Sequence, residues 1–234
     1  MDNWPRIIQD WLFPPTCLLC GDKGTQGRDL CESCARSLPY NHPACPRCAL
    51  PLPFETDSLC GECQRRPPAY GRSFALFHYE EPARHLLTAL KFHARYPCAR
   101  LLGEMLADAL ETQEDKPELI IPVPLHRSRY RERGYNQTLE IARTLSRRLQ
   151  IPVDFASCIR ALATQPQTDL KGKDRRRNVR KAFALTRPMA ASHVAILDDV
   201  VTTGATVNEL AKLLRQAGVG RIEVWACARA GGKG

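Results

Sequence analysis

The sequence lacks the apolar segments that place a protein in or across a membrane. Its 234 residues contain no uninterrupted apolar run of about eighteen, the length that a transmembrane helix requires. The N-terminal stretch MDNWPRIIQDWLFPPT has neither the basic start nor the long apolar centre of a secretory signal. We therefore expect a cytoplasmic protein without a transmembrane segment.

Two further absences narrow the choice of function. No Gly-Lys-Ser or Gly-Lys-Thr step occurs anywhere, which excludes an ATP-binding loop of the Walker type. No internal repeat extends beyond short cysteine pairs. Apolar and charged contents of 44% and 25% are ordinary for a globular protein, so neither disorder nor a fibrous architecture is indicated.

Acidic residues are fewer than basic ones. Lys and Arg number 34 against 25 Asp and Glu, which gives a formal net charge of +9. Such an excess favours polyanionic partners: nucleic acid, phosphorylated metabolites or an acidic membrane face. Charge alone does not choose among these three.

Cysteine, by contrast, is abundant and clustered. Eight of the 11 cysteines fall within residues 17–63 as four Cys-x-x-Cys pairs. This is metal spacing rather than disulfide spacing, because two such pairs place four thiolates at the corners of a tetrahedron, as structural Zn²⁺ requires. We expect two closed structural zinc sites paired in sequence order, with interleaved pairing left open. The eight expected ligands are Cys17, Cys20, Cys31, Cys34, Cys45, Cys48, Cys60 and Cys63.

The other three cysteines, Cys98, Cys158 and Cys227, lie in apolar neighbourhoods. We interpret them as small, reduced core residues rather than reactive thiols.

The chain changes character near Pro67 and Pro68, which predicts a cysteine-rich double zinc-ribbon module over 1–68 and an α/β domain over 69–234. In the second part, strand-like and helix-like segments alternate, and this pattern predicts a mostly parallel sheet with helices on both faces. Strands are expected at 73–79, 118–123, from 151 onward, 193–197 and 221–228, and helices at 83–94, 98–112, 136–149 and 206–217.

Residues 194–207, VAILDDVVTTGATV, join a buried strand to an amphipathic helix through two acids and a loop of small residues. Unpaired N–H groups at a helix start, aided by the helix dipole, can cradle a phosphate. Carboxylates repel phosphate, so Asp198 and Asp199 suit an uncharged diol or a divalent cation. A sugar carrying a 5′-phosphate satisfies both demands. The expected phosphate loop consists of Thr202, Thr203, Gly204, Ala205 and Thr206.

The whole ordered string, an apolar strand, two acids, two variable residues and Thr-Gly-x-Thr, resembles the motif of type I phosphoribosyltransferases that binds phosphoribosyl pyrophosphate (PRPP). The resemblance implies a type I phosphoribosyltransferase-like fold, ribose hydroxyls on Asp198 and Asp199, the 5′-phosphate on residues 202–206, and Mg²⁺ bound with PRPP. One position departs from the pattern: Ala205 stands where a second glycine is usual. A methyl group there need not abolish binding.

Two basic runs accompany this motif. In the transferase comparison, PVPLHRSRYRERGYNQ falls in the loop after the first core strand, which holds the pyrophosphate of PRPP, and KGKDRRRNVRKAF falls in the mobile loop over the active site. The forked donors of arginine suit phosphate oxygens. Residues expected to bind pyrophosphate or nucleic acid are Arg127, Arg129, Arg131, Arg133, Lys171, Lys173, Arg175, Arg176, Arg177, Arg180 and Lys181.

A polymer is favoured over a single PRPP as the partner of these runs. Seven positive charges between residues 171 and 181 exceed what one PRPP needs. Tyr130 and Tyr135 interleave with the arginines, so bases of a single strand can stack beside a phosphate-tracking groove. His126 is interpreted as a hydrogen-bonded structural residue rather than an acid/base group.

A double Cys-x-x-Cys module joined to a PRPP-type domain is similar to the ComF family of competence proteins. The stretches ALKFHARYPCARLLGEML, IIPVPLHRSRYRERGYNQ, RRRNVRKAF and LDDVVTTGAT carry the resemblance across most of the chain. It implies a role in natural transformation, in which incoming single-stranded DNA is handled as it enters the cytoplasm, and possible partners in the competence machinery at the inner membrane.

Two functions follow from these observations. The first is a DNA-uptake protein that binds single-stranded DNA and uses its PRPP-type site for a ligand or regulator. The alternative is an active phosphoribosyltransferase of nucleotide salvage or metabolism. No segment identifies an acceptor pocket, so the catalytic residues are unknown and transfer activity does not follow from the motif. A pure zinc-ribbon adaptor, a third reading, leaves the phosphate loop unexplained.

Overall fold

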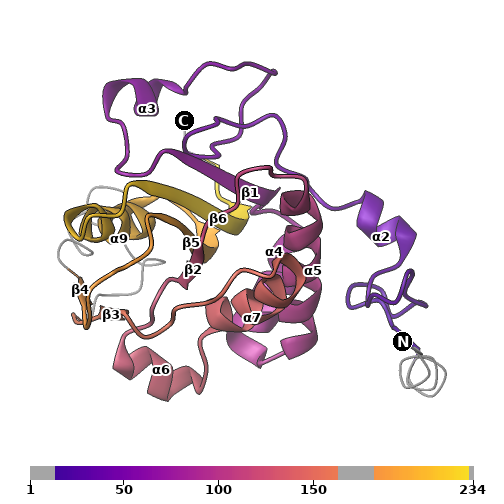
Figure 1. Ribbon diagram of the computed structural model, residues 1–234. Helices are drawn as coiled ribbons and strands as arrows, with labels where there is room; N and C mark the ends of the chain where they lie inside the picture. Colours follow the sequence, from indigo (N-terminus) through magenta and orange to yellow (C-terminus); the bar gives the residue numbers. More distant parts are fainter. Residues whose placement is uncertain (1–13, 163–181, 232–234) are drawn as a thin grey trace.

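A parallel sheet of four strands lies at the centre of the molecule (Figure 1). The computed structural model describes residues 14–162 and 182–231. All three strand pairs within this sheet are parallel, as predicted. In spatial order the strands are β1 (Arg72–His78), β6 (Arg221–Arg229), β5 (His193–Val201) and β2 (Leu119–Pro122).

Strand β5 is central and longer than the sequence predicts. Residues 194–197 are fully buried, as expected for a parallel strand covered on both faces. The strand continues past the expected end at 197, because its pairing with β6 runs on to the Val201–Arg229 pair. Asp198 and Asp199 therefore lie within the last part of the strand rather than after it.

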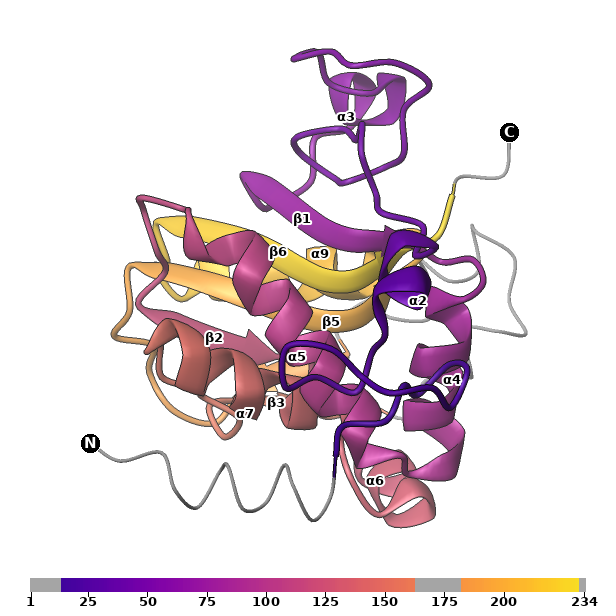
Figure 2. The ribbon, with the colours of Figure 1, turned by 90° about the vertical axis from the view of Figure 1, so that its right-hand side faces the viewer.

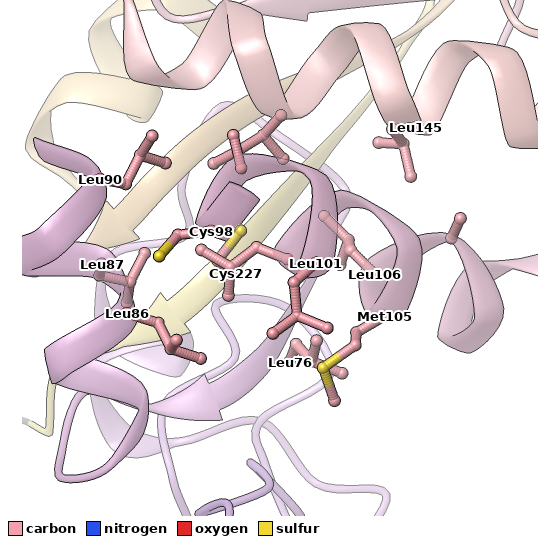
Figure 3. Close-up of a cluster of buried hydrophobic side chains, with 14 of the residues drawn as sticks. Leu76, Leu86, Leu87, Leu90, Cys98, Leu101, Met105, Leu106, Leu145 and Cys227 are labelled. Atoms are coloured by element: carbon pink, nitrogen blue, oxygen red, sulfur yellow. The ribbon is translucent and has the colours of Figure 1, made fainter. Parts of the chain in front are cut away.

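Three helices cover one face of the sheet: α4 (Ala83–His93), α5 (Tyr96–Glu111) and α7 (Gln137–Leu149). All three lie within two residues of the predicted ranges, and Asn136 caps α7 as expected by accepting from Thr138 N–H at 3.0 Å. Their leucines pack with Cys98 and Cys227 in one buried cluster (Figure 3). These two thiols and Cys158 are buried and reduced, as predicted.

Helices α5 and α7 approach each other closely at Gly103. A Cβ atom at this position would lie 2.8 Å from the Cβ of Thr144 and 3.0 Å from the Ile141 carbonyl oxygen. Real side chains do not tolerate such distances, so the crossing requires glycine. This crossing fixes α7, and through it the N-terminal end of that helix, against the sheet.

Helix α9 (Ala205–Gln216) covers the opposite face, together with the antiparallel pair β3 (Cys158–Arg160) and β4 (Phe183–Leu185). Leu210 and Leu214 of α9 are fully buried in the second core cluster. The helix begins and ends one residue earlier than predicted. Residues 202–204 connect β5 to the N-terminus of α9, so the acidic pair and the helix start lie at the same end of the sheet.

The strand predicted to begin at 151 does not form there, and this expectation was wrong. Val153 makes only an isolated bridge to Ile120, and the strand in this region is β3. Pro152 lacks an N–H group. The Asp154 carboxylate accepts from the N–H groups of Ala156 and Ser157 at 2.9 Å each, which stabilises a turn instead of an extended ladder.

The cysteine-rich module packs on the α/β domain at two separate places (Figure 2). Its first half, which contains α2 (Glu32–Arg36), forms ion pairs with α5 through Arg28–Asp108 and Asp29–Arg100. Its second half, which contains α3 (Gly61–Arg65), lies along β1. There the Ser73 hydroxyl donates to the carbonyl of Arg47 at 3.0 Å.

No helix in residues 14–162 and 182–231 combines the length and the apolar character needed to cross a bilayer.

Candidate functional site

The eight cysteines of the module form two groups in sequence order. One group is Cys17, Cys20, Cys31 and Cys34, the other Cys45, Cys48, Cys60 and Cys63, and within each group all sulfurs lie within 4.8 Å of one another. The Cys20–Cys31 and Cys48–Cys60 sulfur distances are both 3.6 Å. A tetrahedral site with Zn–S bonds of about 2.3 Å has sulfurs about 3.8 Å apart, so both groups fit zinc. The favoured sequence-order pairing is confirmed.

Backbone N–H groups already point at the sulfurs. Cys34 N–H donates to the Cys31 sulfur at 3.4 Å, and Cys60 N–H donates to the Cys45 sulfur at 3.3 Å. Such bonds stabilise thiolate and hold the knuckle in the ligating conformation. Both sites are closed by four protein ligands, so they suit a structural metal that folds the module rather than a catalytic one.

The acidic pair sits beside a buried amide. Asp199 is buried, its backbone N–H donates to Asp198 Oδ1 at 2.9 Å, and its Oδ2 accepts from Gln137 Nε2 at 3.2 Å. Gln137 is the first residue of α7, directly after the Asn136 cap. The helix start therefore fixes the orientation of one carboxylate.

The two carboxyl groups have opposite pKa shifts. Burial and the neighbouring Asp199 charge raise the pKa of Asp198 well above its ordinary value of 3.8. Burial also acts to raise the pKa of Asp199, but the Lys91 ammonium and the hydrogen bonds from Asp198 and Gln137 outweigh it and lower that pKa. Burial and like charge therefore disfavour ionisation of Asp198, whereas the Lys91 charge favours the ionised form of Asp199.

The predicted phosphate loop turns sharply at Gly204. Gly204 has φ +73°, in the left-handed region that favours glycine, and α9 begins at the next residue. Thr203 is exposed and its Oγ1 accepts from Ala205 N–H at 3.3 Å, whereas Thr206 is buried. The N-terminus of a helix of this length can hold an anion through its first amides.

Arg229, at the end of β6, supports this loop from behind. Its Nη1 donates to the carbonyls of Thr202 and Val201, the latter at 3.2 Å. Arg229 is buried, so its guanidinium acts on the backbone of the loop and does not reach an external ligand.

The first basic run forms a helix, α6 (Arg127–Arg133), where the transferase comparison led us to expect a loop. His126 caps it, with Nδ1 accepting from Ser128 N–H at 3.2 Å, and Gly134 ends it at φ +81°. The structural interpretation of His126 is thereby confirmed.

The four arginines of α6 are distributed around the helix. Arg127 and Arg131 are exposed, whereas Arg129 and Arg133 are partly buried. Arg129 pairs with Glu132 at 3.1 Å, and Arg133 donates to Gln137 Oε1. Arg133 therefore joins the acidic pair through Gln137, while the exposed two face solvent.

The two tyrosines of this run have different environments. Tyr130 is 51% exposed, as base stacking requires. Tyr135 is only 6% exposed and its hydroxyl donates to the Leu90 carbonyl, so its predicted stacking role is wrong. Its position after the Gly134 turn directs the ring into the core.

The second basic run lies outside the described residues. The residues of this run that were expected to bind pyrophosphate or nucleic acid are Lys171, Lys173, Arg175, Arg176, Arg177, Arg180 and Lys181.

Sequence reasoning missed several residues around the acidic pair. Lys91 of α4 and Gln137 act on Asp199 as described, and the Asp198 charge acts on Arg160, whose guanidinium carbon lies 5.7 Å above the Phe183 ring. Lys91 and Gln137 occur inside the stretches quoted above for family resemblance, which is the one signal that pointed to them. Arg160 and Arg229 lie in no sequence motif that would have pointed to them.

Comparison with known proteins connects this geometry to a family. Residues 8–64 match the model of the "Double zinc ribbon domain". Competence protein F of Haemophilus influenzae is 38% identical, with 92% of this chain and 96% of that protein covered. The DNA utilization protein YhgH of Escherichia coli O157:H7 is 36% identical, with 92% and 97% covered. The chain belongs to the ComF family.

Solved structures that resemble this ComF-family chain include phosphoribosyltransferases. The glutamine PRPP amidotransferase of B. subtilis gives a TM-score of 0.37 at 20% identity, with 55% of this chain and 26% of that chain covered. The purine phosphoribosyltransferase of Pyrococcus horikoshii gives 0.33 at 18% identity, with 56% and 82% covered.

The ComF-family fold itself agrees with the prediction. It is an α/β domain with a mostly parallel sheet, flanking helices and an N-terminal double zinc ribbon that holds two groups of four cysteines.

Proposed function

We propose that this ComF-family protein acts in natural transformation by handling single-stranded DNA, and that its acidic pair and loop bind PRPP or a similar phosphorylated ribose. One observation supports both halves together. Gln137 donates to Asp199 at 3.2 Å and accepts from Arg133, so a single buried amide joins the sugar-binding acids to the basic helix α6. A phosphorylated ribose and a DNA strand therefore bind on connected parts of one surface.

In the proposed ligand site, different groups bind the sugar and the phosphate of the ligand. The carboxylates of Asp198 and Asp199 accept from ribose hydroxyls or bind Mg²⁺, whereas the helix start at Ala205 and the Thr203 hydroxyl receive the 5′-phosphate. Gly204 brings the backbone close to the phosphate oxygens. The two zinc ions remain structural and take no part in ligand chemistry.

The DNA partner is inferred from charge and exposure. The Arg127 and Arg131 side chains are exposed, and each phosphate that such a side chain neutralises releases counterions. A role for residues 171–181 in the same surface remains a prediction, as do the division of the chain at residue 68, the cytoplasmic location and partners at the inner membrane.

The test measures both ligands on the same protein. Fluorescence anisotropy with labelled oligo-dT is expected to show binding whose log affinity falls with log salt, by about 0.7 per phosphate neutralised. Isothermal titration with PRPP and Mg²⁺ is expected to show binding that is lost in the double variant Asp198→Asn/Asp199→Asn. Absence of DNA binding at low salt contradicts the first half of the proposal.

A matched control separates loss of charge from loss of the site. Asp115 is an exposed acid at the opposite end of the same sheet, where it pairs with Arg221. Asp115→Asn is expected to bind PRPP as the wild type does. Equal weakening in both variants contradicts the proposed sugar contact, and pyrophosphate release with a panel of bases or amines would instead favour an active transferase.

A further inference from the structure

Three exposed aromatic residues belong to α4, α5 and α6, and α6 approaches the end of α4 where Arg133 lies over the Phe92 ring. Phe92, in the last turn of α4, is 62% exposed, and Tyr96, at the start of α5, is 48% exposed. Tyr130 of α6 is 51% exposed. A single exposed aromatic ring is common on protein surfaces, but three on adjoining elements call for an explanation. We name Phe92, Tyr96 and Tyr130 the aromatic corner.

Tyr96 of the aromatic corner is anchored to the core. The Tyr96 ring lies 5.2 Å from the ring of buried Tyr135, and the Tyr135 hydroxyl donates to the Leu90 carbonyl of α4. Leu90 is fully buried in the cluster of Figure 3. An aromatic ring held in this way loses little conformational entropy when a partner binds to it.

Two cations accompany Phe92. The Lys91 Nζ atom lies 5.8 Å from the centre of its ring and the Arg133 guanidinium carbon 5.9 Å. The same two cations act on the acidic pair, since Arg133 donates to Gln137, the partner of Asp199, and Lys91 is the neighbouring charge that favours ionised Asp199. The aromatic corner is therefore continuous with the proposed ligand site.

We propose that Phe92 stacks an unpaired base of single-stranded DNA, with Tyr96 and Tyr130 extending the platform and Lys91 and Arg133 neutralising the flanking phosphates. This inference rests on the proposed function and names the surface that carries it. Rings interleaved with cations are what a single strand needs, because every base has a stacking face and every nucleotide a charge. A purely apolar protein partner has no use for the two cations.

The decisive experiment compares two ligands of equal charge. Oligo-dT and an abasic oligonucleotide of the same length carry the same phosphates, and only the first carries bases. The wild-type protein is expected to bind oligo-dT more tightly. Phe92→Ala is expected to weaken oligo-dT binding roughly five- to hundredfold while it leaves binding of the abasic strand unchanged, since stacking on one ring contributes an affinity factor of that order.

A matched control tests the specificity of this effect. Phe54, in the second half of the cysteine module, is 67% exposed. Phe54→Ala removes an equally exposed ring away from the aromatic corner, and its affinities for both oligonucleotides are expected to equal those of the wild type.

A spectroscopic readout checks the contact directly. In Phe92→Trp, stacking of a thymine on the new indole is expected to quench fluorescence as oligo-dT is added, and the abasic strand is expected to leave it unquenched. The same titration of Phe54→Trp serves as the baseline. No quenching in Phe92→Trp, with DNA binding intact, overturns the stacking.

The outcomes separate the inference from the function beneath it. If the wild type binds neither oligonucleotide, the proposed function fails. If the wild type binds oligo-dT and Phe92→Ala binds it equally well, the function stands and the aromatic corner is not the DNA surface. Equal affinity of the wild type for the two oligonucleotides also overturns the stacking proposal.

Discussion

The Nε atom of Arg229 donates a hydrogen bond to the carbonyl oxygen of Cys48 at 3.0 Å. Cys48 belongs to the second group of four cysteines, and the other side of the same guanidinium holds the carbonyls of Val201 and Thr202. One buried cation therefore connects the second half of the cysteine module to the start of the proposed phosphate loop. The half of the module that holds the first group of four cysteines contacts α5 instead, through the ion pairs of Arg28 and Asp29.

Loss of the second zinc is expected to loosen the loop, whereas loss of the first is not. Cys63→Ser removes a ligand of the second site and Cys34→Ser removes one of the first, so each variant is expected to hold one zinc fewer by elemental analysis. Backbone hydrogen exchange over residues 200–206 is expected to quicken in Cys63→Ser alone, because Cys48 no longer holds Arg229 in place. An equal change in the two variants contradicts this coupling.

Arg229→Lys is expected to lower the free energy of unfolding by about 2 kcal/mol. A lysine ammonium cannot reach carbonyls on both sides as the planar guanidinium does, so buried acceptors lose their donors. The matched control is Arg221→Lys at the other end of β6, where Arg221 forms an exposed pair with Asp115 and the expected cost is below about 1 kcal/mol. Urea denaturation of both variants measures the difference, and equal midpoints would show that Arg229 is not a structural link.

The parts of this architecture that could be predicted are local in sequence. Cys-x-x-Cys pairs impose their own geometry, and the parallel strand, acidic pair and helix start occur within residues 194–207. Strand β5 ran four residues further than expected, because its pairing with β6 and not its apolar run decides where it ends. The run RSRYRER has no apolar stripe, so its helix was missed until the caps at His126 and Gly134 were visible.

The contacts that organise the candidate site are remote in sequence. Gln137 and Asp199 are 62 positions apart, and Cys48 and Arg229 are 181 apart. No periodicity or spacing in the sequence predicts such a contact, because it depends on the order of strands in the sheet and on the crossing of α5 with α7. The prediction for Tyr135 was wrong for the same reason. Its alternation with arginines predicted an exposed ring, but the ring is buried against α4.

Asp198→Asn is expected to stabilise the folded protein at neutral pH and to leave it unchanged in acid. The raised pKa of Asp198 means that the folded state holds a proton which the unfolded state releases above its ordinary pKa of 3.8. The free energy of unfolding therefore falls as pH rises from that value towards the raised pKa. An asparagine side chain resembles the protonated carboxylic acid and does not titrate, so the variant does not lose this part of the unfolding free energy as the pH rises.

Thermal denaturation of Asp198→Asn and wild type across a pH series checks the sign. The difference in melting temperature is expected to grow from acid to neutral pH. A difference that is constant with pH would indicate that the substitution acts through packing. The Asp115→Asn control is expected to lose a little stability at neutral pH, because the Arg221 guanidinium lowers the pKa of Asp115 and its charge is favourable there.

Two neighbouring substitutions in the proposed phosphate loop are expected to differ in their effect on PRPP binding although both destabilise the fold. Gly204→Ala places a side chain at φ +73° and a Cβ atom 3.4 Å from the Tyr70 hydroxyl, so the loop must leave its conformation at a cost of about 1 kcal/mol or more. PRPP affinity measured by titration is expected to fall at least fivefold. Ala205→Gly changes the first helical residue, which restores the glycine usual in the transferase motif.

Ala205→Gly is therefore the matched control for Gly204→Ala. It is expected to cost up to about 1 kcal/mol of helix stability through backbone entropy and to leave PRPP affinity within about twofold of the wild type, because the amides of the helix start are unchanged. If Gly204→Ala binds PRPP as well as Ala205→Gly does, the left-handed turn is not what admits the phosphate. The site would then have to hold its anion on the α6 arginines instead, and Arg127→Gln would become the variant that loses PRPP.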